Sequence, residues 1–152
     1  PVKELIWVLR DTNRGSEDST PALNLTKSLT NGNDWFNYSS ASLNTDLNLG
    51  TYDQFNTAKI VINGIDRFIE RDAVYFRQVQ PYQHHSGYPV QGINSYSFAL
   101  KPEEHQPSGT CNFSRIDNAQ LVQGTGVACE VYAVNYNVLR IMSGMGGLAY
   151  SN

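Results

Sequence analysis

Short hydrophobic runs of β type, separated by polar stretches, make up most of this chain. Residues 2–9 (VKELIWVL) are apolar and partly β-branched. Read as a strand, they place one apolar row on each face: Leu5, Trp7 and Leu9 on one, and Val2, Ile6 and Val8 on the other. A strand that is apolar on both faces is usually covered on both sides, so we expect residues 2–9 to be buried.

Further strands are predicted where β-rich or alternating segments recur: residues 58–65, 94–100, 111–117, 127–142 and 148–151. Residues 127–142 are too long for one ordinary strand, so we expect a bend near 135–137. Only residues 72–79 suggest a helix, which Pro81 should end. Strands without alternating helices predict an antiparallel all-β sandwich or barrel with at most one short helix.

A long polar segment, residues 11–57, interrupts this pattern. Asn, Asp, Ser, Thr and Gly make up 29 of its 47 residues, and no helical or alternating period persists. Its six acidic and two basic residues give a net charge of −4, against −3 for the whole chain. We expect a long surface loop, whose aromatic residues allow it to pack against itself or a neighbour.

Composition narrows the functional classes. Length favours one domain, because 152 residues is close to the usual domain size. Charged residues are only 16% of the chain, below the average of about 25%. A pI near 5.5 without basic clusters argues against nucleic-acid binding. With no apolar run of 18 residues, no membrane span is predicted.

No catalytic, cofactor or metal site is predicted. His84 and His85 have only His105 as a further histidine, which leaves no convergent ligand set, so we interpret them as a solvated loop pair. Glu103 and Glu104 are neighbours in a turn, whereas glycosidase carboxylates face each other across a sugar. The two cysteines are interpreted as reduced thiols in a β core.

Two structural roles are nevertheless suggested. Arg115 alternates with Cys111 and Phe113, so we expect it to point partly inward and to form an ion pair between strands or subunits. Three sequons, at Asn24, Asn37 and Asn112, are candidate glycosylation sites if the chain enters a secretory compartment.

Four segments of the chain carry a family resemblance. They are SFALKPEEHQPSGTCNFSRIDNAQL (97–121), EVYAVNYNVLRIMSGMGGLAYSN (130–152), PVKELIWVLR (1–10) and YFRQVQPYQHH (75–85). Together they closely resemble the C-terminal end of the major capsid proteins of large eukaryotic DNA viruses. The Gln-Pro-Ser-Gly turn, the Asn-Phe-Ser-Arg-Ile-Asp segment and the terminal glycine-rich turn are the most specific features.

The resemblance implies a double jelly-roll capsid protein, not an enzyme, with no cofactor. Residues 1–152 would be the C-terminal part of the second jelly roll, without the first jelly roll and the first strands of the second. Three copies would form a pseudo-hexagonal capsomer in an icosahedral shell, in contact with neighbouring capsomers and minor capsid proteins. The virion would be its location, after assembly in the host cytoplasm. We name Trp35, Phe36 and Tyr38 as candidate inter-subunit contacts.

Two alternatives from other classes remain open at this point. A jelly-roll carbohydrate-binding module is supported by the aromatic, Asn-rich loop and by Tyr82 and Tyr88, because aromatic platforms and amides bind sugars. A cupin-like metalloenzyme is disfavoured, because the histidine-rich ligand set is missing.

Overall fold

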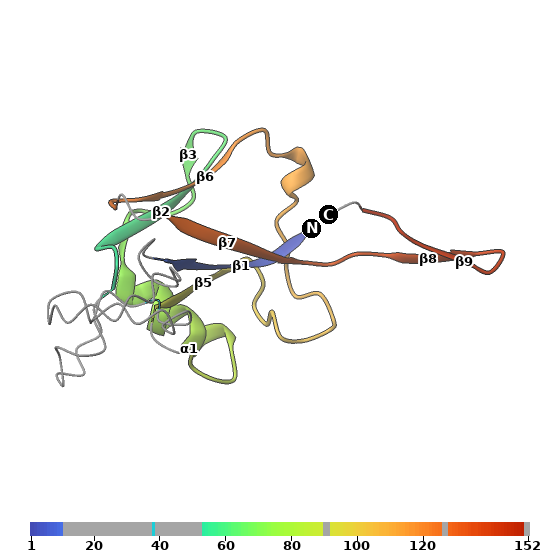
Figure 1. Ribbon diagram of the computed structural model, residues 1–152, viewed down its shortest axis with the longest axis horizontal. Coiled ribbons are helices and arrows are strands. Elements are labelled where there is room, and N and C mark those ends of the chain that lie inside the picture. Colours follow the sequence, from blue (N-terminus) through green and yellow to red (C-terminus); the bar gives the residue numbers. More distant parts are fainter. Residues whose placement is uncertain (11–37, 39–52, 90–91, 126–127, 151–152) are drawn as a thin grey trace, which may run out of the picture.

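Antiparallel β-sheets organise the chain in the computed structural model, which describes residues 1–10, 38, 53–89, 92–125 and 128–150. In the first sheet, β1 (Val2–Leu9) lies between β5 (Ile93–Ser97) and β7 (Cys129–Asn135). Figure 1 shows these three strands running through the centre of the molecule. The predicted burial of residues 2–9 is confirmed, since six of the eight residues of β1 are buried.

The second sheet is built around β2 (Thr57–Ile62). On one side β2 pairs with β6 (Ala119–Gln123), and on the other with two short strands, β3 (Ile65–Asp66) and β4 (Arg71–Asp72). A two-residue turn joins β2 to β3. Asn63 and Gly64 have φ of 50° and 80° in that turn, which is the left-handed geometry that two-residue hairpin turns need.

The core fills the space between the two sheets and is closed by a helical segment. Trp7 of β1 and Phe76 are both fully buried, and their rings meet edge to face with centroids 5.2 Å apart. From the second sheet, Ala58 and Ile60 complete the core, and Tyr96 joins it from β5. The predicted row of Leu5, Trp7 and Leu9 lies in this cluster.

A bulge in β1 changes one predicted position. Val2 was expected on the face opposite Trp7, but it belongs to the same core cluster. The register between β1 and β7 shifts between Val2 and Glu4, so one residue is inserted into the alternation. Such a bulge moves the preceding side chain to the other face of the strand.

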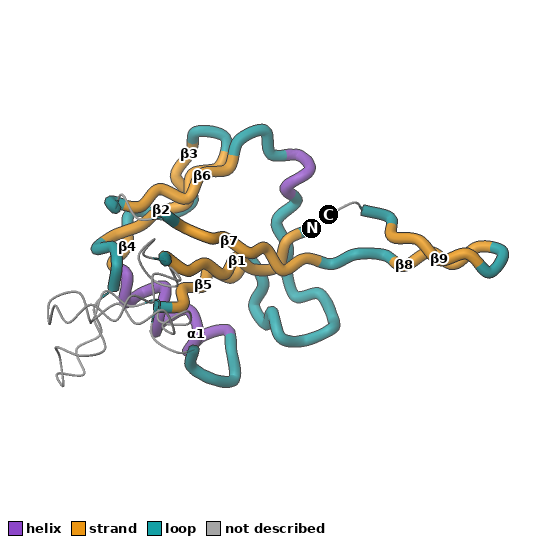
Figure 2. The backbone as a smooth tube through the Cα atoms, in the orientation of Figure 1, coloured by secondary structure: helices purple, strands orange, loops and turns teal. Residues whose placement is uncertain are grey.

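The helical segment consists of a π-helical turn, η1 (Tyr75–Val79), followed directly by α1 (Gln80–His84). In Figure 2 the segment lies beside the first sheet. The prediction that Pro81 ends the helix is wrong. Pro81 occupies the first turn of α1, where a missing N–H and a fixed φ are tolerated.

Residues 111–117 do not form the predicted strand. Cys111 makes only an isolated β-bridge with Val2, and Phe113–Arg115 form a 3₁₀ turn, η2. The Asn112 side chain accepts a hydrogen bond from the Ser114 N–H at 3.1 Å. Asn and Ser often favour such local turns over extended pairing, which explains the difference.

The predicted bend in residues 127–142 is confirmed. β7 ends at Asn135, and β8 (Leu139–Met142) begins two residues after Asn137, which lies in the break between the two strands. Asn137 Oδ1 accepts from the N–H groups of Val138 and Tyr150 at 2.8 and 3.1 Å, and its Nδ2 donates to the Tyr150 carbonyl. The Asn137 side chain therefore makes hydrogen bonds at this break that backbone pairing between strands would otherwise make.

The last strand begins earlier than predicted. β9 (Met145–Leu148) pairs with β8 across a two-residue turn at Ser143 and Gly144, whose φ angles are 50° and 79°. The expected strand at 148–151 is therefore wrong, since a tight turn of this type leaves Gly146 and Gly147 inside β9. Figure 1 shows the β8–β9 hairpin extending away from both sheets.

Candidate interaction surface

Exposed apolar side chains gather on the last strands of the chain. Nine residues of β7, β8, β9 and their flanks, each 46–73% exposed, form what we call the C-terminal apolar surface: Val131, Tyr132, Val138, Leu139, Ile141, Met142, Met145, Leu148 and Tyr150. All eight strand residues of the β8–β9 hairpin are exposed. Exposed apolar residues concentrated on a projecting hairpin are unusual on a free soluble domain and mark interaction sites.

Charge is scarce along this surface. Glu130 and Arg140 are the only charged residues between positions 128 and 150. Arg10 lies 3.7 Å from the Glu130 carboxylate, and the Tyr132 hydroxyl donates a hydrogen bond to it at 2.9 Å. That hydrogen bond, together with the negative charge of Glu130, raises the pKa of Tyr132 above its ordinary value. The phenol therefore stays neutral, and the surface remains suitable for burial.

The backbone of this region also leaves strand edges available. Within the described residues β7 pairs with β1 on one side only, and β8 and β9 pair only with each other. Open edges offer N–H and C=O groups to a further strand. The surface thus combines apolar side chains with unused pairing capacity.

Of the three predicted inter-subunit residues, the structure describes Tyr38. Trp35 and Phe36 fall outside the described residues. Tyr38 is half-buried, and its carbonyl accepts a hydrogen bond from Gln54 Nε2 at 2.8 Å. The same amide donates to the Leu9 carbonyl at 3.0 Å, so Tyr38 is tied to the end of β1. Its role as a subunit contact stays a prediction.

The structure places Arg115 differently from the sequence expectation. Arg115 ends the η2 turn and is exposed, and no ion pair with it occurs among the described residues. The expected inward direction depended on strand alternation, which a 3₁₀ turn does not have. Of the sequons, Asn112 is exposed at the N-cap of this turn, whereas Asn24 and Asn37 lie outside the described residues.

The two neighbouring histidines are held by specific partners and are not a solvated pair. His84 Nδ1 lies 2.9 Å from the Leu100 carbonyl oxygen. His85 lies between two carboxylates, with Nε2 3.0 Å from Glu4 and Nδ1 3.2 Å from Glu103. Sequence reasoning missed this cluster, because Glu4, His85 and Glu103 are far apart along the chain.

Neither a metal-ion cluster nor a membrane-spanning helix occurs in the described part of the chain. There, no group of three or more His, Cys, Asp or Glu side chains is arranged to hold a metal ion. The described helices include none with the length and apolarity needed to cross a membrane. Both Cys111 and Cys129 are free and half-buried, and burial raises the pKa of each thiol.

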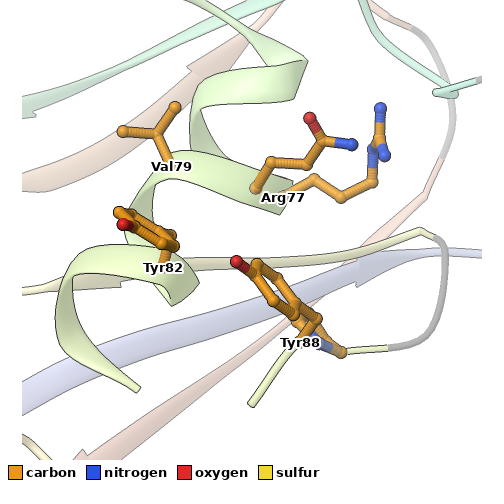
Figure 3. Close-up of a pocket in the computed structure, with 6 residues that line it drawn as sticks. Arg77, Val79, Tyr82 and Tyr88 are labelled. Carbon is orange, nitrogen blue, oxygen red and sulfur yellow. The ribbon is translucent and has the colours of Figure 1, made fainter. Parts of the chain in front are cut away.

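A pocket of about 490 Å³ lies beside the helical segment. The helical segment contributes Arg77, Gln78, Val79 and Tyr82 to its lining, and the stretch after the helix contributes Tyr88 and Pro89. Figure 3 shows the Tyr82 and Tyr88 rings on the same side of this hollow. Tyr82 and Tyr88 were named from sequence as support for a carbohydrate-binding module, but their stacking and the contribution of Arg77 had no sequence signal.

Comparison with known proteins identifies the family. The family model for the large eukaryotic DNA virus major capsid protein matches residues 1–147. The major capsid protein of Pyramimonas orientalis virus is 44% identical over an alignment that covers all of this chain. That of Phaeocystis pouchetii virus is 69% identical over 104 residues, or 62% of the chain. The chain therefore belongs to this capsid protein family, which is a family of structural proteins and not of enzymes.

Structural comparison agrees. The crystal structure of PBCV-1 VP54, fitted into a reconstruction of the virophage Sputnik, matches all of this chain with a TM-score of 0.72 and 38% identity. The predicted fold class, antiparallel β with one short α-helix as in a double jelly-roll capsid protein, is thereby confirmed. The chain spans 37% of the Pyramimonas orientalis virus protein, 20% of the Phaeocystis pouchetii virus protein and 44% of the PBCV-1 chain.

Proposed function

We propose that this protein is a structural subunit of a viral capsid. Three copies form a pseudo-hexagonal capsomer, and capsomers tile an icosahedral shell together with minor capsid proteins. The subunit resides in the virion after assembly in the host cytoplasm, and residues 1–152 form the C-terminal part of the second jelly roll. Family membership supports the capsid role, and the observation that carries the assembly role is the C-terminal apolar surface.

Energetics favour burial of that surface. Complete removal of a large aliphatic side chain from water stabilises a folded protein or an interface by about 1.5–3 kcal/mol. The nine residues of the C-terminal apolar surface are still roughly half or more exposed, so much of this free energy is available to a partner. Obligate interfaces commonly bury more than about 2,000 Å² and resemble a core cut in half. The small number of charged residues on this surface also favours its burial, because an unpaired buried charge costs several kcal/mol.

Two charge substitutions at positions of similar exposure test the assembly role. Ile141 in β8 is 69% exposed and belongs to the C-terminal apolar surface, whereas Ile65 in β3 is 73% exposed and lies outside it. We expect Ile141→Glu to prevent trimer formation and Ile65→Glu to leave it intact. Mass photometry or sizing chromatography with light scattering measures the trimer, and circular dichroism verifies the fold. Normal trimers from Ile141→Glu would overturn the proposal.

Cross-linking then distinguishes contacts between copies from contacts within one chain. A photo-crosslinking residue at position 141 is introduced into a mixture of isotopically light and heavy protein. We expect light–heavy cross-linked peptides, because the hairpin contacts another copy. Exclusively light–light and heavy–heavy products would show that the hairpin packs within its own chain, which contradicts this part of the proposal.

A further inference from the structure

The pocket beside the helical segment has features that capsid assembly does not explain. It is separate from the C-terminal apolar surface, because its lining comes from residues 77–79, Tyr82, Tyr88 and Pro89, not from β7–β9. Its volume of about 490 Å³ is within the range of small-ligand sites, about 300–1,000 Å³.

An aromatic platform forms one side of this pocket. The rings of Tyr82 and Tyr88 are nearly parallel, 17° apart, with centroids separated by 6.5 Å. Despite this mutual contact the two residues stay 73% and 69% exposed. A stacked pair already has restricted side-chain rotation, so a ligand that packs on it costs less ordering entropy. The pair therefore offers a preorganised apolar face with two hydroxyl groups at its margin (Figure 3).

Arg77 provides hydrogen-bond donors without a free positive charge. Its Nε donates to Asp53 Oδ1 at 2.8 Å and its Nη2 to Asp53 Oδ2 at 3.3 Å. The Arg77 and Asp53 side chains are only 9% and 14% exposed, so the pair is fixed and its charges cancel. This pairing leaves Nη1 without a partner among the described residues. A neutral polar ligand suits this site better than a phosphate or sulfate, which needs uncompensated cations.

The remaining lining completes the chemical match. Gln78 contributes an amide that both donates and accepts hydrogen bonds, and Val79 and Pro89 contribute apolar walls. A pyranose ring has the complementary character: an apolar C–H face that packs on an aromatic ring, and hydroxyl groups around its rim that pair with amide and guanidinium groups. We propose that the Tyr82–Tyr88 pocket binds a neutral carbohydrate, with the rings as platform and Arg77 and Gln78 as hydrogen-bonding groups.

Saturation-transfer NMR tests this proposal on the purified protein. The probes are neutral oligosaccharides of glucose, mannose, galactose and N-acetylglucosamine, with sulfated heparin fragments as the charged comparison. We expect binding of at least one neutral oligosaccharide, and a loss of affinity of about tenfold or more in Tyr82→Ala and Tyr88→Ala. Tyr82→Phe should retain most of the affinity, because it keeps the ring. Ile69→Ala, at a position that is 69% exposed and lies outside both the pocket and the C-terminal apolar surface, is the control and should bind normally.

Three outcomes would overturn the proposal. They are no binding of any neutral oligosaccharide at millimolar concentration, equal binding by wild type and both alanine variants, and binding restricted to sulfated fragments. Trimer mass is measured on the same variants. If Tyr82→Ala and Tyr88→Ala reduce trimer formation while sugar binding is absent, the platform is a subunit contact and not a carbohydrate site. Gln78→Ala, which leaves the buried Arg77–Asp53 pair intact, should weaken sugar binding without affecting thermal stability.

Discussion

Nε2 of His85 lies 3.0 Å from Oε2 of Glu4, whose side chain is only 8% exposed in the first sheet. On its other side, His85 reaches Glu103 in the turn-rich connection after β5. One imidazole at the end of α1 thus joins three segments that are distant along the chain. The Glu4 side chain is held out of water here, and polar contacts in such surroundings are stronger than in bulk water.

Glu103 makes part of this arrangement sensitive to acid. The Ser86 N–H donates to both carboxylate oxygens at 3.1 Å, and this lowers the pKa of Glu103 below its ordinary value of 4.5, with His85 adding to the effect. A carboxylate with a lowered pKa stabilises the fold above that ordinary value, and the stabilisation is lost as pH falls through the lowered pKa. Glu103→Gln should therefore lower the melting temperature at neutral pH but not at low pH, as measured by scanning calorimetry.

Glu104 provides the control for this pH dependence. It is the adjacent acid, and its carboxylate pairs only with the exposed Lys101 ammonium at 3.1 Å among the described residues. Glu104→Gln should change the melting temperature little at any pH, because exposed pairs contribute little. An equal and pH-independent effect of both variants would contradict the role given to Glu103.

Gly109, in the Gln-Pro-Ser-Gly turn, is predicted to be intolerant of a side chain. Its φ is 147°, and a Cβ atom there would lie 2.8 Å from the Phe98 carbonyl oxygen. Gly109→Ala should lower the free energy of unfolding by about 1–3 kcal/mol. An alanine there would be strained at this φ, and its Cβ atom would be too close to the Phe98 carbonyl oxygen. Urea denaturation measures the change. Gly87→Ala, where no atom lies within 4 Å, is the control, and equal losses in the two variants would refute the prediction.

Trp7 is predicted to contribute the most to the core. It is fully buried between β5 and β7 on the central strand and packs edge to face on Phe76. Trp7→Ala should lower the free energy of unfolding by about 3–5 kcal/mol, because it leaves a large cavity. Ile65→Ala, at a position that is 73% exposed, should change it by less than about 0.5 kcal/mol. Denaturation followed by circular dichroism compares the two.

Trp35 remains a predicted contact between subunits. A large aromatic residue in a polar loop is costly to expose, so we expect it to lie in a contact between subunits. Trp35→Glu should weaken the trimer, as detected by its mass on sizing chromatography. A trimer of unchanged mass and stability would remove Trp35 from the set of contact residues.

The hydrophobic pattern of the sequence predicted the strands that form the core. It did not predict the segments whose conformation is set by local hydrogen bonds of polar side chains. Residues 2–9 were predicted correctly because burial on both faces leaves a plain signal in sequence. Residues 111–117 show a similar alternation, yet Asn112 caps a 3₁₀ turn there. The position of Val2 depends on a bulge, which a regular two-residue period cannot reveal.

The contacts around the candidate sites were beyond sequence reasoning for a different reason. Arg77 and Asp53 are 24 residues apart, and no spacing pattern in the sequence links the two. Their pairing, like that of Glu4 with His85, results from how the two sheets and the helix pack. Arg115 shows the converse case, in which a clear sequence expectation failed because the local conformation changed which way the side chain points.

The β8–β9 hairpin has a consequence for how capsid protein behaves before it assembles. Its exposed edges and apolar residues are as available to a wrong chain as to the correct one. If assembly uses this surface, as proposed above, correct assembly and irregular aggregation compete for it, and their relative rates depend on protein concentration and temperature. Particle yield should consequently fall when newly made protein accumulates faster than it finds its partners.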